Sequence, residues 1–339
     1  MKISEEKKNS IILYILNKID EGEQSISLKV SESLGINQST VHAYINELVD
    51  KRIIRKIKRG KYEIVSVSFS YEFSRSKGEL NEESEVFRKS FSEHISNLQD
   101  NVRNIWDYAF SEMINNVIDH SNADKLSITV NCDYLKTEVI IDDNGVGIFE
   151  KIRKHFGFNT IDDAICELFK GKLTTDSENH SGEGIFFSSK LVDEFYIISD
   201  GRIFADNKYD EEALFRIKGR DLGGTCVIMS MSNFSKRIAK DVFDQYADDE
   251  GSFIRTRIPL GSIFETNPIS RSQAKRICSR FESFEEVILD FTGVNWMGQG
   301  FAHQIFVVFA NSHESVNIIP VNMSEDVTKM YRHVMNTGK

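Results

Sequence analysis

The sequence predicts a multidomain protein that combines α+β and α/β parts, and three observations lead to this prediction. The chain has 339 residues, which is more than one hydrophobic core usually organises and suits two or three domains. Residues 1–65 show helical spacing of apolar residues and then two short strand-like arms. Residues 251–339 alternate strand-like and helix-like stretches, which is the pattern of a small sheet layered with helices.

The composition is that of a folded protein in a reducing compartment. Apolar residues make up 40% of the chain and charged residues 28%, with only 3 prolines. No apolar stretch approaches the roughly 18 residues that span a membrane, and the charged N-terminus does not resemble a signal peptide. The four cysteines, Cys132, Cys166, Cys226 and Cys278, match no metal or disulfide spacing. We therefore expect buried thiols in a cytoplasmic protein without a membrane segment.

Charge is distributed unevenly along the chain. The formal net charge is −10, but residues 1–65 contain 12 lysines and arginines against 9 aspartates and glutamates. This part therefore carries +3 and the remainder carries −13. A basic N-terminal module in an otherwise acidic chain indicates that this module binds a polyanion and that the other modules do not.

The first module, residues 1–66, is predicted to hold three helices and a hairpin. A helix in EEKKNSIILYILNKIDEG should end at Gly22, and a short helix in SLKVSESLG should stop at Gly35. A third helix follows in INQSTVHAYINELVDKR. The stretch IIRKIKRGKYEIV then has the pattern of two strands around a turn near Gly60.

This order of elements resembles a winged helix-turn-helix DNA-binding domain. The resemblance implies that the third helix enters the major groove of DNA and that the hairpin lies along the backbone. The candidate base-reading residues are Gln38, Ser39, Thr40 and His42. The candidate phosphate contacts are Lys51, Arg52, Arg55, Lys56, Lys58, Arg59 and Lys61. The alternative is a winged helix that makes only protein contacts.

Residues 67–94 are predicted to be a connector. Their sequence is polar and weakly periodic, apart from a helix predicted from Leu80 to Phe91. We expect this segment to lead into the second domain and to pack on it in part.

The second domain, residues 95–235, begins with a helix that carries an unusual polar stripe. In FSEMINNVIDHSNAD, Glu112, Asn116 and His120 fall four residues apart and therefore on one face of a helix. Apolar residues fill the neighbouring stripe. Taken alone, such a row of polar residues is usually a solvated helix surface.

Three glycine-rich turns follow this helix. A strand in TEVIIDD runs into DNGVG at residues 143–147, Gly182 and Gly184 open a later helix, and GGTCVIMSM leads into a strand near Thr225. Each motif is weak by itself, since DNG also favours a hairpin turn. The four motifs in this order are a much stronger signal than any one of them.

Together these motifs resemble the ATP-binding domain shared by gyrase, heat-shock chaperones, sensor histidine kinases, MutL and anti-sigma-factor kinases, the GHKL class. The resemblance implies a Bergerat-type α/β sandwich that binds ATP and Mg²⁺. The stretch EMINNVIDHS is most similar to the motif of the anti-sigma-factor kinases.

The resemblance also implies a role for each matching residue. Asn116 would ligate Mg²⁺ through its side-chain oxygen, and Glu112 would orient or deprotonate the attacking group. Asp143 would accept the adenine amino group, with Thr225 supporting the ring through water. Further nucleotide contacts would come from His120, Gly145, Gly147, Gly182 and Gly184. An ATP lid is implied between Asp163 and Ser181, with phosphate contacts chosen from Lys172, Thr174, Thr175 and His180.

The third domain, residues 251–339, resembles a STAS domain, and more narrowly the STAS-like domain often fused to this type of ATPase. The resemblance rests on VILDFTGVNWMGQGFAHQIFVVFA. In anti-sigma-factor antagonists the strand-to-helix turn holds a serine that the partner kinase phosphorylates, whereas the turn at residues 297–300 has no hydroxyl. Thr292 is the nearest hydroxyl, on the strand side. We expect a docking or regulatory role, with a packing or dimerisation unit as the alternative.

These parts predict an ATP-dependent regulator that couples Mg-ATP binding to DNA and to an unidentified protein partner, with or without slow hydrolysis. Two alternatives stay open: a serine/threonine protein kinase that acts on a separate STAS protein, and a DNA-binding repressor with ATP as a structural ligand. A sensor histidine kinase is not expected, because no dimerisation helix with a phosphoacceptor histidine precedes the ATP domain. By analogy with anti-sigma-factor kinases, we expect a homodimer.

Overall fold

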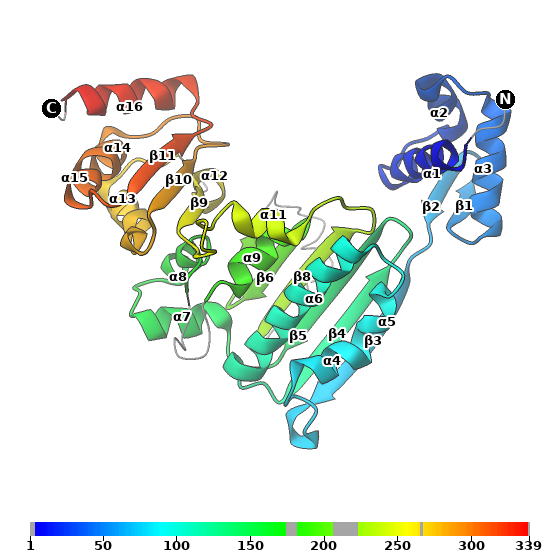
Figure 1. Cartoon of the computed structure of the whole chain (residues 1–339), viewed down its shortest axis with the longest axis horizontal. Helices are drawn as coiled ribbons and strands as arrows, with labels where there is room; N and C mark the ends of the chain where they lie inside the picture. Colours follow the sequence, from blue (N-terminus) through cyan, green and yellow to red (C-terminus); the bar gives the residue numbers. More distant parts are fainter. Residues whose placement is uncertain (1–3, 174–181, 206–222, 265–266, 338–339) are drawn as a thin grey trace.

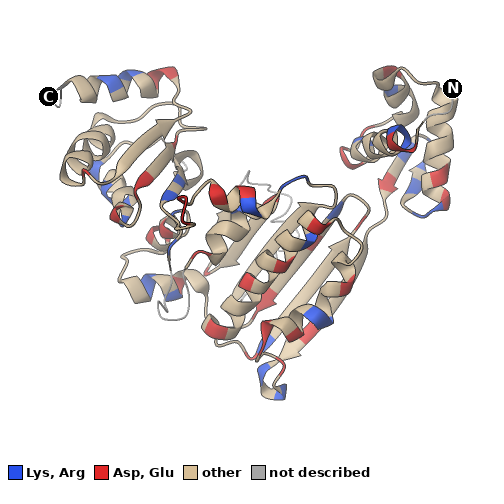
Figure 2. Cartoon of the chain, in the orientation of Figure 1, with Lys and Arg blue, Asp and Glu red and all other residues tan. Residues whose placement is uncertain are grey.

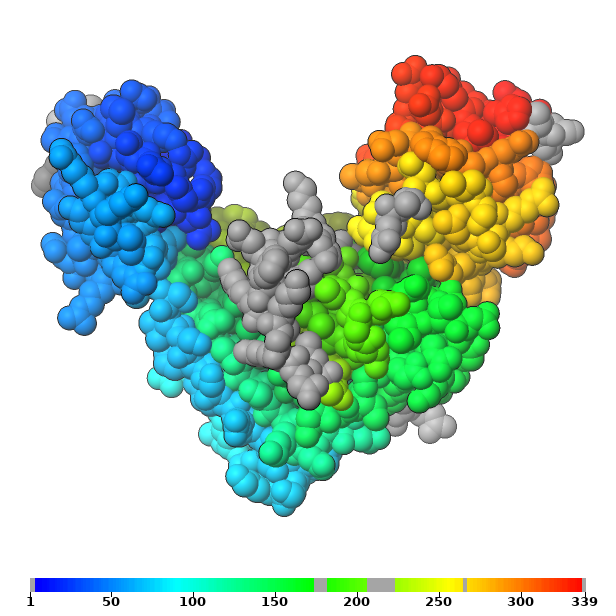
Figure 3. Space-filling model, turned by 180° about the vertical axis from the view of Figure 1, so that it is seen from behind, coloured from blue at the N-terminus to red at the C-terminus, as the bar shows by residue number. Residues whose placement is uncertain are grey.

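The computed structural model describes residues 4–173, 182–205, 223–264 and 267–337. Two smaller parts, one at each end of the chain, rise from opposite ends of a larger central part (Figures 1 and 3). Among the described residues, no helix is long and apolar enough to cross a membrane.

The N-terminal part contains the three predicted helices and the predicted hairpin. They are α1 (Glu5–Asp20), α2 (Ile26–Leu34), α3 (Gln38–Asp50), β1 (Ile54–Lys58) and β2 (Lys61–Ile64), with the two strands antiparallel. The hydroxyl of Ser4 caps α1 by accepting a hydrogen bond from the Lys7 amide. Gly35 ends α2 in the left-handed conformation that glycine adopts without strain. Apolar faces of all three helices bury one small core.

The central part is a two-layer sandwich of one sheet and several helices. Its strands are β3 (Val67–Ser74), β4 (Lys125–Cys132), β5 (Lys136–Asp143), β6 (Glu194–Ser199), β7 (Arg202–Ala205) and β8 (Thr225–Ser232). They pair in the order β3-β4-β5-β8-β6-β7, and every pair is antiparallel. The helices on one face include α4 (Glu83–Ser90), α5 (Ser92–Ile95), α6 (Asp100–Asn115), α9 (Gly184–Leu191) and α11 (Ala239–Asp244) (Figure 1).

The segment predicted to be a connector belongs to this central sandwich instead. Strand β3 pairs with β4 over its whole length, from Val67 opposite Cys132 to Ser74 opposite Lys125. After the turn η1 (Arg75–Lys77), helix α4 lies within the predicted helix from Leu80 to Phe91, and Phe91 stacks on Phe110 of α6 with ring centroids 4.7 Å apart. The prediction failed because an edge strand keeps much of its surface exposed and therefore stays polar.

The N-terminal part packs against the tip of the β4–β5 hairpin. Leu135 is only 8% exposed and packs into the core formed by α1, α2 and α3. Phe234, just beyond β8, packs against the same core. The N-terminal part therefore rests on the ends of strands whose other ends border the site described below.

The C-terminal part is a small parallel sheet with helices, as the alternating pattern predicted. Its strands β9 (Arg255–Pro259), β10 (Glu286–Asp290) and β11 (Asn317–Val321) are parallel in the order β11-β10-β9. Its helical elements are α12 (Leu260–Ile263), α13 (Arg271–Cys278), η3 (Phe281–Ser283), α14 (Gln299–His303), η4 (Gln304–Phe309), α15 (Ala310–Ser312) and α16 (Glu325–Thr337). Parallel neighbours need such crossover connections.

The central and C-terminal parts share one continuous hydrophobic core. Helices α7 (Ile148–Phe156) and α8 (Ile161–Leu168) lie next to the C-terminal part (Figure 1). Phe253 joins the two parts, because its ring lies 4.9 Å from that of Phe186 in α9 and 5.4 Å from that of Phe284 before β10. All four cysteines are free thiols, and three of them are buried.

Candidate nucleotide-binding site

The helix with the polar stripe changes its geometry at the predicted site. It is α-helical to Asn115 and continues as a π-helical turn, η2 (Asn116–His120). A π turn widens the helix and often occurs at functional sites. Arg75 stabilises this irregular end, because its guanidinium donates hydrogen bonds to the carbonyl oxygens of Ala123 at 2.8 Å and Ile118 at 3.0 Å. The sequence predicted a regular helix here.

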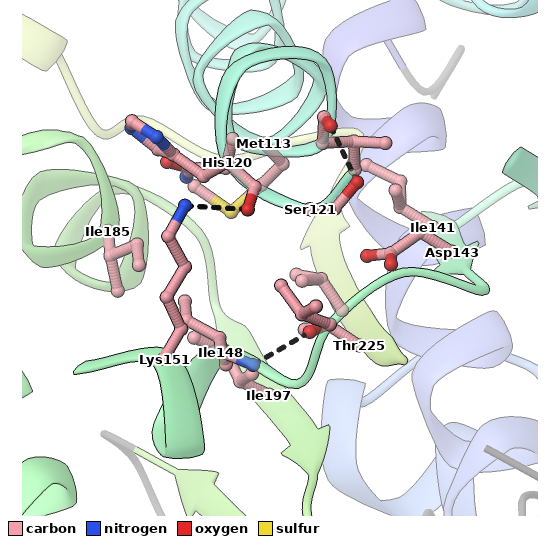
Figure 4. Close-up of a pocket in the computed structure, with 14 residues that line it drawn as sticks. Met113, His120, Ser121, Ile141, Asp143, Ile148, Lys151, Ile185, Ile197 and Thr225 are labelled. Carbon is pink, nitrogen blue, oxygen red and sulfur yellow. Dashed lines mark hydrogen bonds between the residues drawn. The ribbon is translucent and has the colours of Figure 1, made fainter. Parts of the chain in front are cut away.

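A cavity lies beside this turn, between helices and sheet (Figure 4). It is lined by Met113, Asn116, Val117, His120, Ser121, Ile141, Asp143, Val146, Ile148, Lys151, Ile185, Ile197, Thr225 and Val227. The lining is mostly apolar with a few polar side chains, as in small-molecule sites generally. Four of the residues predicted to bind nucleotide, from three distant stretches of sequence, thus meet at one cavity: Asn116, His120, Asp143 and Thr225.

Asp143 forms the polar floor of the cavity at the end of β5. Its side chain is 5% exposed, and its Oδ1 accepts a hydrogen bond from the Gly145 amide at 2.8 Å. Burial raises the pKa of this carboxyl group to about 6, although the hydrogen bond from Gly145 acts in the opposite direction. The backbone of Thr225 also hydrogen-bonds this carboxylate, and a buried carboxylate has lone pairs enough to accept a further hydrogen bond from a ligand amine.

Thr225, the first residue of β8, lies near Asp143 and helps to hold the loop opposite. Its Oγ1 accepts a hydrogen bond from the Ile148 amide at 3.2 Å, and the Ser199 hydroxyl accepts from the same amide at 3.2 Å. Ser199 in turn donates to the Gly224 carbonyl at 2.9 Å. The role of Ser199 could not be predicted from the sequence, because Ser199 lies on β6 and no motif surrounds it.

The glycines of DNGVG have a packing role in addition to the predicted approach to adenine, which stays a prediction. A Cβ atom on Gly145 would lie 2.1 Å from the Ser121 carbonyl oxygen, and one on Gly147 would lie 2.1 Å from the Asp200 carboxylate. These glycines therefore let neighbouring chain segments approach one another, and they are not among the residues that line the cavity. The prediction attributed them to close approach of the adenine ring.

Gly182 and Gly184 lie at the start of α9, just before Ile185, which lines the cavity. A Cβ atom on Gly184 would lie 2.0 Å from Glu112 Oε2, so the absence of a side chain there leaves room for this carboxylate. Gly182 has a φ angle of +73° beside the backbone of Leu173. Glu112 thus lies next to the glycine-led helix start, beside the cavity and one turn before Asn116.

Two parts of the chain match protein-family models. Residues 102–233 match the model described as histidine kinase-, DNA gyrase B- and HSP90-like ATPase. The central part contains a GHKL-type ATPase domain. Residues 273–328 match the STAS-like domain of unknown function (DUF4325). Both family resemblances expected from the sequence are therefore confirmed, whereas no curated protein matches the chain.

Lys172, a predicted phosphate contact, is bound to the STAS-like domain. Its Nζ donates a hydrogen bond to the Ser283 carbonyl at 2.9 Å and lies over the rings of Phe253 and Phe284. Residues 163–168, predicted as the start of the lid, belong to helix α8. The other predicted lid contacts, Thr174, Thr175 and His180, lie outside the described residues.

A magnesium ion fits the site only as a partner of the nucleotide. The described residues contain no group of three or more His, Cys, Asp or Glu that could hold a metal ion. Mg²⁺ in nucleotide sites usually takes one or two protein oxygens and completes its shell with phosphates and water. The Asn116 amide at the cavity wall offers one such oxygen.

The predicted DNA contacts lie in the N-terminal part, away from the cavity. Gln38, Ser39 and His42 on α3 are exposed, and Thr40 is half-buried. The basic residues of the hairpin are also exposed (Figure 2): Arg55, Lys56, Lys58, Arg59 and Lys61. Arg55 forms an ion pair with Glu63 on the neighbouring strand.

The pKa of Asp143 predicts how nucleotide affinity depends on pH. The ionised carboxylate accepts a hydrogen bond from an adenine amino group, whereas the protonated form has lost much of this capacity. Because the pKa is raised to about 6, ATP affinity should be constant above pH 7 and should fall as the pH decreases through 6. Calorimetric titration with ATP between pH 5 and pH 8 measures this, and titration with inorganic triphosphate corrects for phosphate protonation. Unchanged affinity down to pH 5 would contradict the assignment.

Proposed function

We propose that this chain is an ATP-dependent regulator. The GHKL-type ATPase domain binds Mg-ATP, and the bound state controls how the N-terminal part binds DNA and how the STAS-like domain binds a protein partner. The observation that carries the proposal is the buried Asp143 carboxylate in a cavity that Asn116 and His120 also line. This arrangement offers an acceptor for adenine at one side and polar groups for phosphates at the other.

The chemistry follows from the positions of three side chains. Asp143 accepts the adenine amino group, and the Asn116 amide oxygen faces the metal–phosphate end. A magnesium ion held there would neutralise charge on the phosphates. Glu112, one turn before Asn116, orients or deprotonates the attacking water. His120 lies at the same end of the cavity and contributes to holding the phosphates.

The N-terminal part acts as a winged helix in this proposal. The polar residues Gln38, Ser39 and His42 are exposed on α3, where they can reach base edges, Gln38 by giving up its 3.2 Å hydrogen bond to the Ser27 hydroxyl. The exposed basic hairpin then follows the phosphate backbone. The net positive charge of residues 1–65 in an acidic chain supports the same use of this part.

The ATPase domain is connected to the STAS-like domain through the chain that leads to the candidate lid. Lys170 is fully buried and donates hydrogen bonds to Glu167 Oε1 at 2.5 Å and to the Ser279 carbonyl at 2.6 Å. Its own carbonyl accepts from the Thr256 hydroxyl at 2.8 Å. Because this chain continues toward Gly182 and Gly184, a change at the nucleotide can shift the STAS-like domain. The second copy of a homodimer, or another protein, would sense this shift.

The test of the proposal is phosphate release from the full chain with Mg-ATP, measured for wild type and for Glu112→Ala. We expect wild type to release phosphate slowly and Glu112→Ala to bind ATP but to release it about 10²- to 10⁴-fold more slowly. Asp100→Ala, an exposed position in the first turn of the same helix, should behave as wild type.

DNA is added in a parallel set of reactions, since coupling requires the rate or the ATP affinity to change. Equal release by Glu112→Ala and wild type would make Glu112 structural. Binding without release in any reaction would leave a nucleotide-controlled switch. Transfer of phosphate to an added STAS protein with a serine at its turn would instead identify a protein kinase.

A further inference from the structure

Lys151 is a charged residue of the cavity for which the sequence motifs predict no role. It lies on α7, four residues after the last glycine of DNGVG, and lines the cavity with Asn116 and His120. Its Nζ donates a hydrogen bond to the backbone carbonyl of His120 at 2.7 Å. Figure 4 shows the side chain extending from α7 across the cavity toward the end of the π turn.

The ammonium group of Lys151 has no carboxylate partner among the described residues. Its ammonium group donates to a carbonyl oxygen instead, and partial burial lowers the pKa of Lys151 with no acidic neighbour acting in the opposite direction. Burial of a cation without a counter-charge costs free energy. A cation held in this way at a ligand cavity is therefore prepared for an anionic ligand.

The other basic residues of α7 are satisfied outside the cavity. Arg153 donates to Glu150 at 2.6 Å, and Lys154 lies 3.3 Å from the same carboxylate. These pairs have the helical spacing of ordinary surface ion pairs. Lys151 differs from both because its side chain points into the cavity and is held by the backbone of another element.

The position of the Lys151 ammonium group determines which part of a bound nucleotide it contacts. Asp143 and Thr225 lie together on one side of the cavity in Figure 4, whereas Lys151 Nζ lies at the side of His120 and Ile185. Ile185 directly follows Gly184, the start of α9 and the neighbour of Glu112. The Asp143 side suits adenine, so the Lys151 side faces the phosphates.

We propose that Lys151 binds a phosphate oxygen of the nucleotide while the His120 carbonyl holds its ammonium group in place. An ammonium group has three hydrogen-bond donors, so one can remain on the carbonyl and another can reach the phosphate. Lys151 then discriminates phosphorylated nucleotides from the nucleoside. This inference rests on the proposed binding of ATP and adds a specificity-determining residue to it.

The test is calorimetric titration of the full chain with ATP, ADP and adenosine, for wild type, Lys151→Met and Lys154→Met. Methionine keeps the apolar stem of the side chain and removes the charge. Loss of one charge-assisted hydrogen bond should weaken ATP and ADP binding by about tenfold to a hundredfold. Adenosine affinity should stay within twofold of wild type, which also shows that the cavity of the variant is intact. Lys154→Met should leave all three affinities unchanged.

Each contrary result overturns the inference in a recognisable way. Unchanged ATP affinity in Lys151→Met would show that the ammonium group does not contact phosphate. An equal loss for ATP and adenosine would make Lys151 a structural residue of α7. If wild type bound none of the three ligands, the proposed function would itself fail, and the inference with it.

Discussion

Replacement of Asp143 by asparagine is expected to abolish detectable ATP binding and, at neutral pH, to stabilise the protein without ligand. The carboxylate is the hydrogen-bond acceptor at the floor of the cavity, and an asparagine amide presents a donor where the adenine amino group needs an acceptor. The same carboxylate is costly in the empty protein, because burial raises its pKa from an ordinary value of 3.8 to about 6.

The size and the pH dependence of the stabilisation follow from this shift. Between pH 4 and 6 the folded protein keeps the proton on Asp143 while the unfolded chain loses it, so rising pH destabilises the folded state. Above pH 6 the accumulated cost is about 2 to 3 kcal/mol. Asparagine is neutral at every pH, and its side-chain oxygen can still accept the hydrogen bond from the Gly145 amide.

Thermal unfolding at pH 7.5 and at pH 4, together with calorimetric ATP titration, measures both effects. We expect Asp143→Asn to unfold at a higher temperature than wild type at pH 7.5 and at nearly the same temperature at pH 4. The control is Asp100→Asn, at an exposed position in the first turn of α6. Retained ATP affinity in Asp143→Asn would remove the adenine assignment. A variant that is less stable at pH 7.5 would show that the carboxylate is satisfied in the folded protein.

The sequence was most informative where a residue type is required by local chemistry. The spacing of Glu112, Asn116 and His120 and the DNGVG turn after a strand identified the ATPase domain. Such motifs can be recognised in a sequence because phosphate and adenine sites need glycines, an amide and a carboxylate at fixed separations along one or two helices or strands.

The sequence was least informative where a role depends on contacts between distant elements. Lys151 follows the DNGVG motif closely, but only the fold shows that its side chain turns inward while Lys154 turns outward. Lys172 was predicted to contact phosphate, because the family resemblance implies that it lies in an ATP lid. In the structure it reaches the STAS-like domain.

Strand β3 illustrates a signal that was present and overlooked. Val67, Phe69, Tyr71 and Phe73 alternate with serines and a glutamate, which is the period of a strand. The serines made the segment look like a linker. Its polar character has a different cause, because an edge strand is solvated along much of its length.

Replacement of Lys170 by methionine is expected to weaken the junction between the ATPase and STAS-like domains more than any surface charge change would. The side chain of Lys170 is fully buried, and that of its partner Glu167 is 2% exposed. The variant leaves the Glu167 carboxylate buried with Arg280 of the STAS-like domain as its remaining cation, at 3.3 Å. Removing one partner of a buried ion pair typically costs about 3 to 5 kcal/mol, because the other charge loses its compensation.

Hydrogen exchange followed by mass spectrometry locates this loss. We expect faster exchange in α8 and α13, which meet at the junction, and unchanged exchange in α1 and α3 of the N-terminal part. Lys240→Met is the matched control, since Lys240 forms an exposed ion pair with Asp244 within one helix, and such pairs contribute little.

The double variant Glu167→Gln/Lys170→Met tests whether the ion pair itself stabilises the junction or whether Lys170→Met acts only by leaving the Glu167 carboxylate unpaired. With both charges removed, the penalty of an unpaired buried carboxylate disappears, so part of the lost stability should return. If Lys170→Met exchanges like Lys240→Met, the Lys170–Glu167 pair contributes little, and the junction is held by its other contacts, including those of Phe253 and Lys172. If the junction loosens and ATP affinity changes with it, nucleotide and STAS-like domain are energetically linked, and the linkage must act in both directions. A protein partner that binds the STAS-like domain would then alter ATP affinity by the same factor.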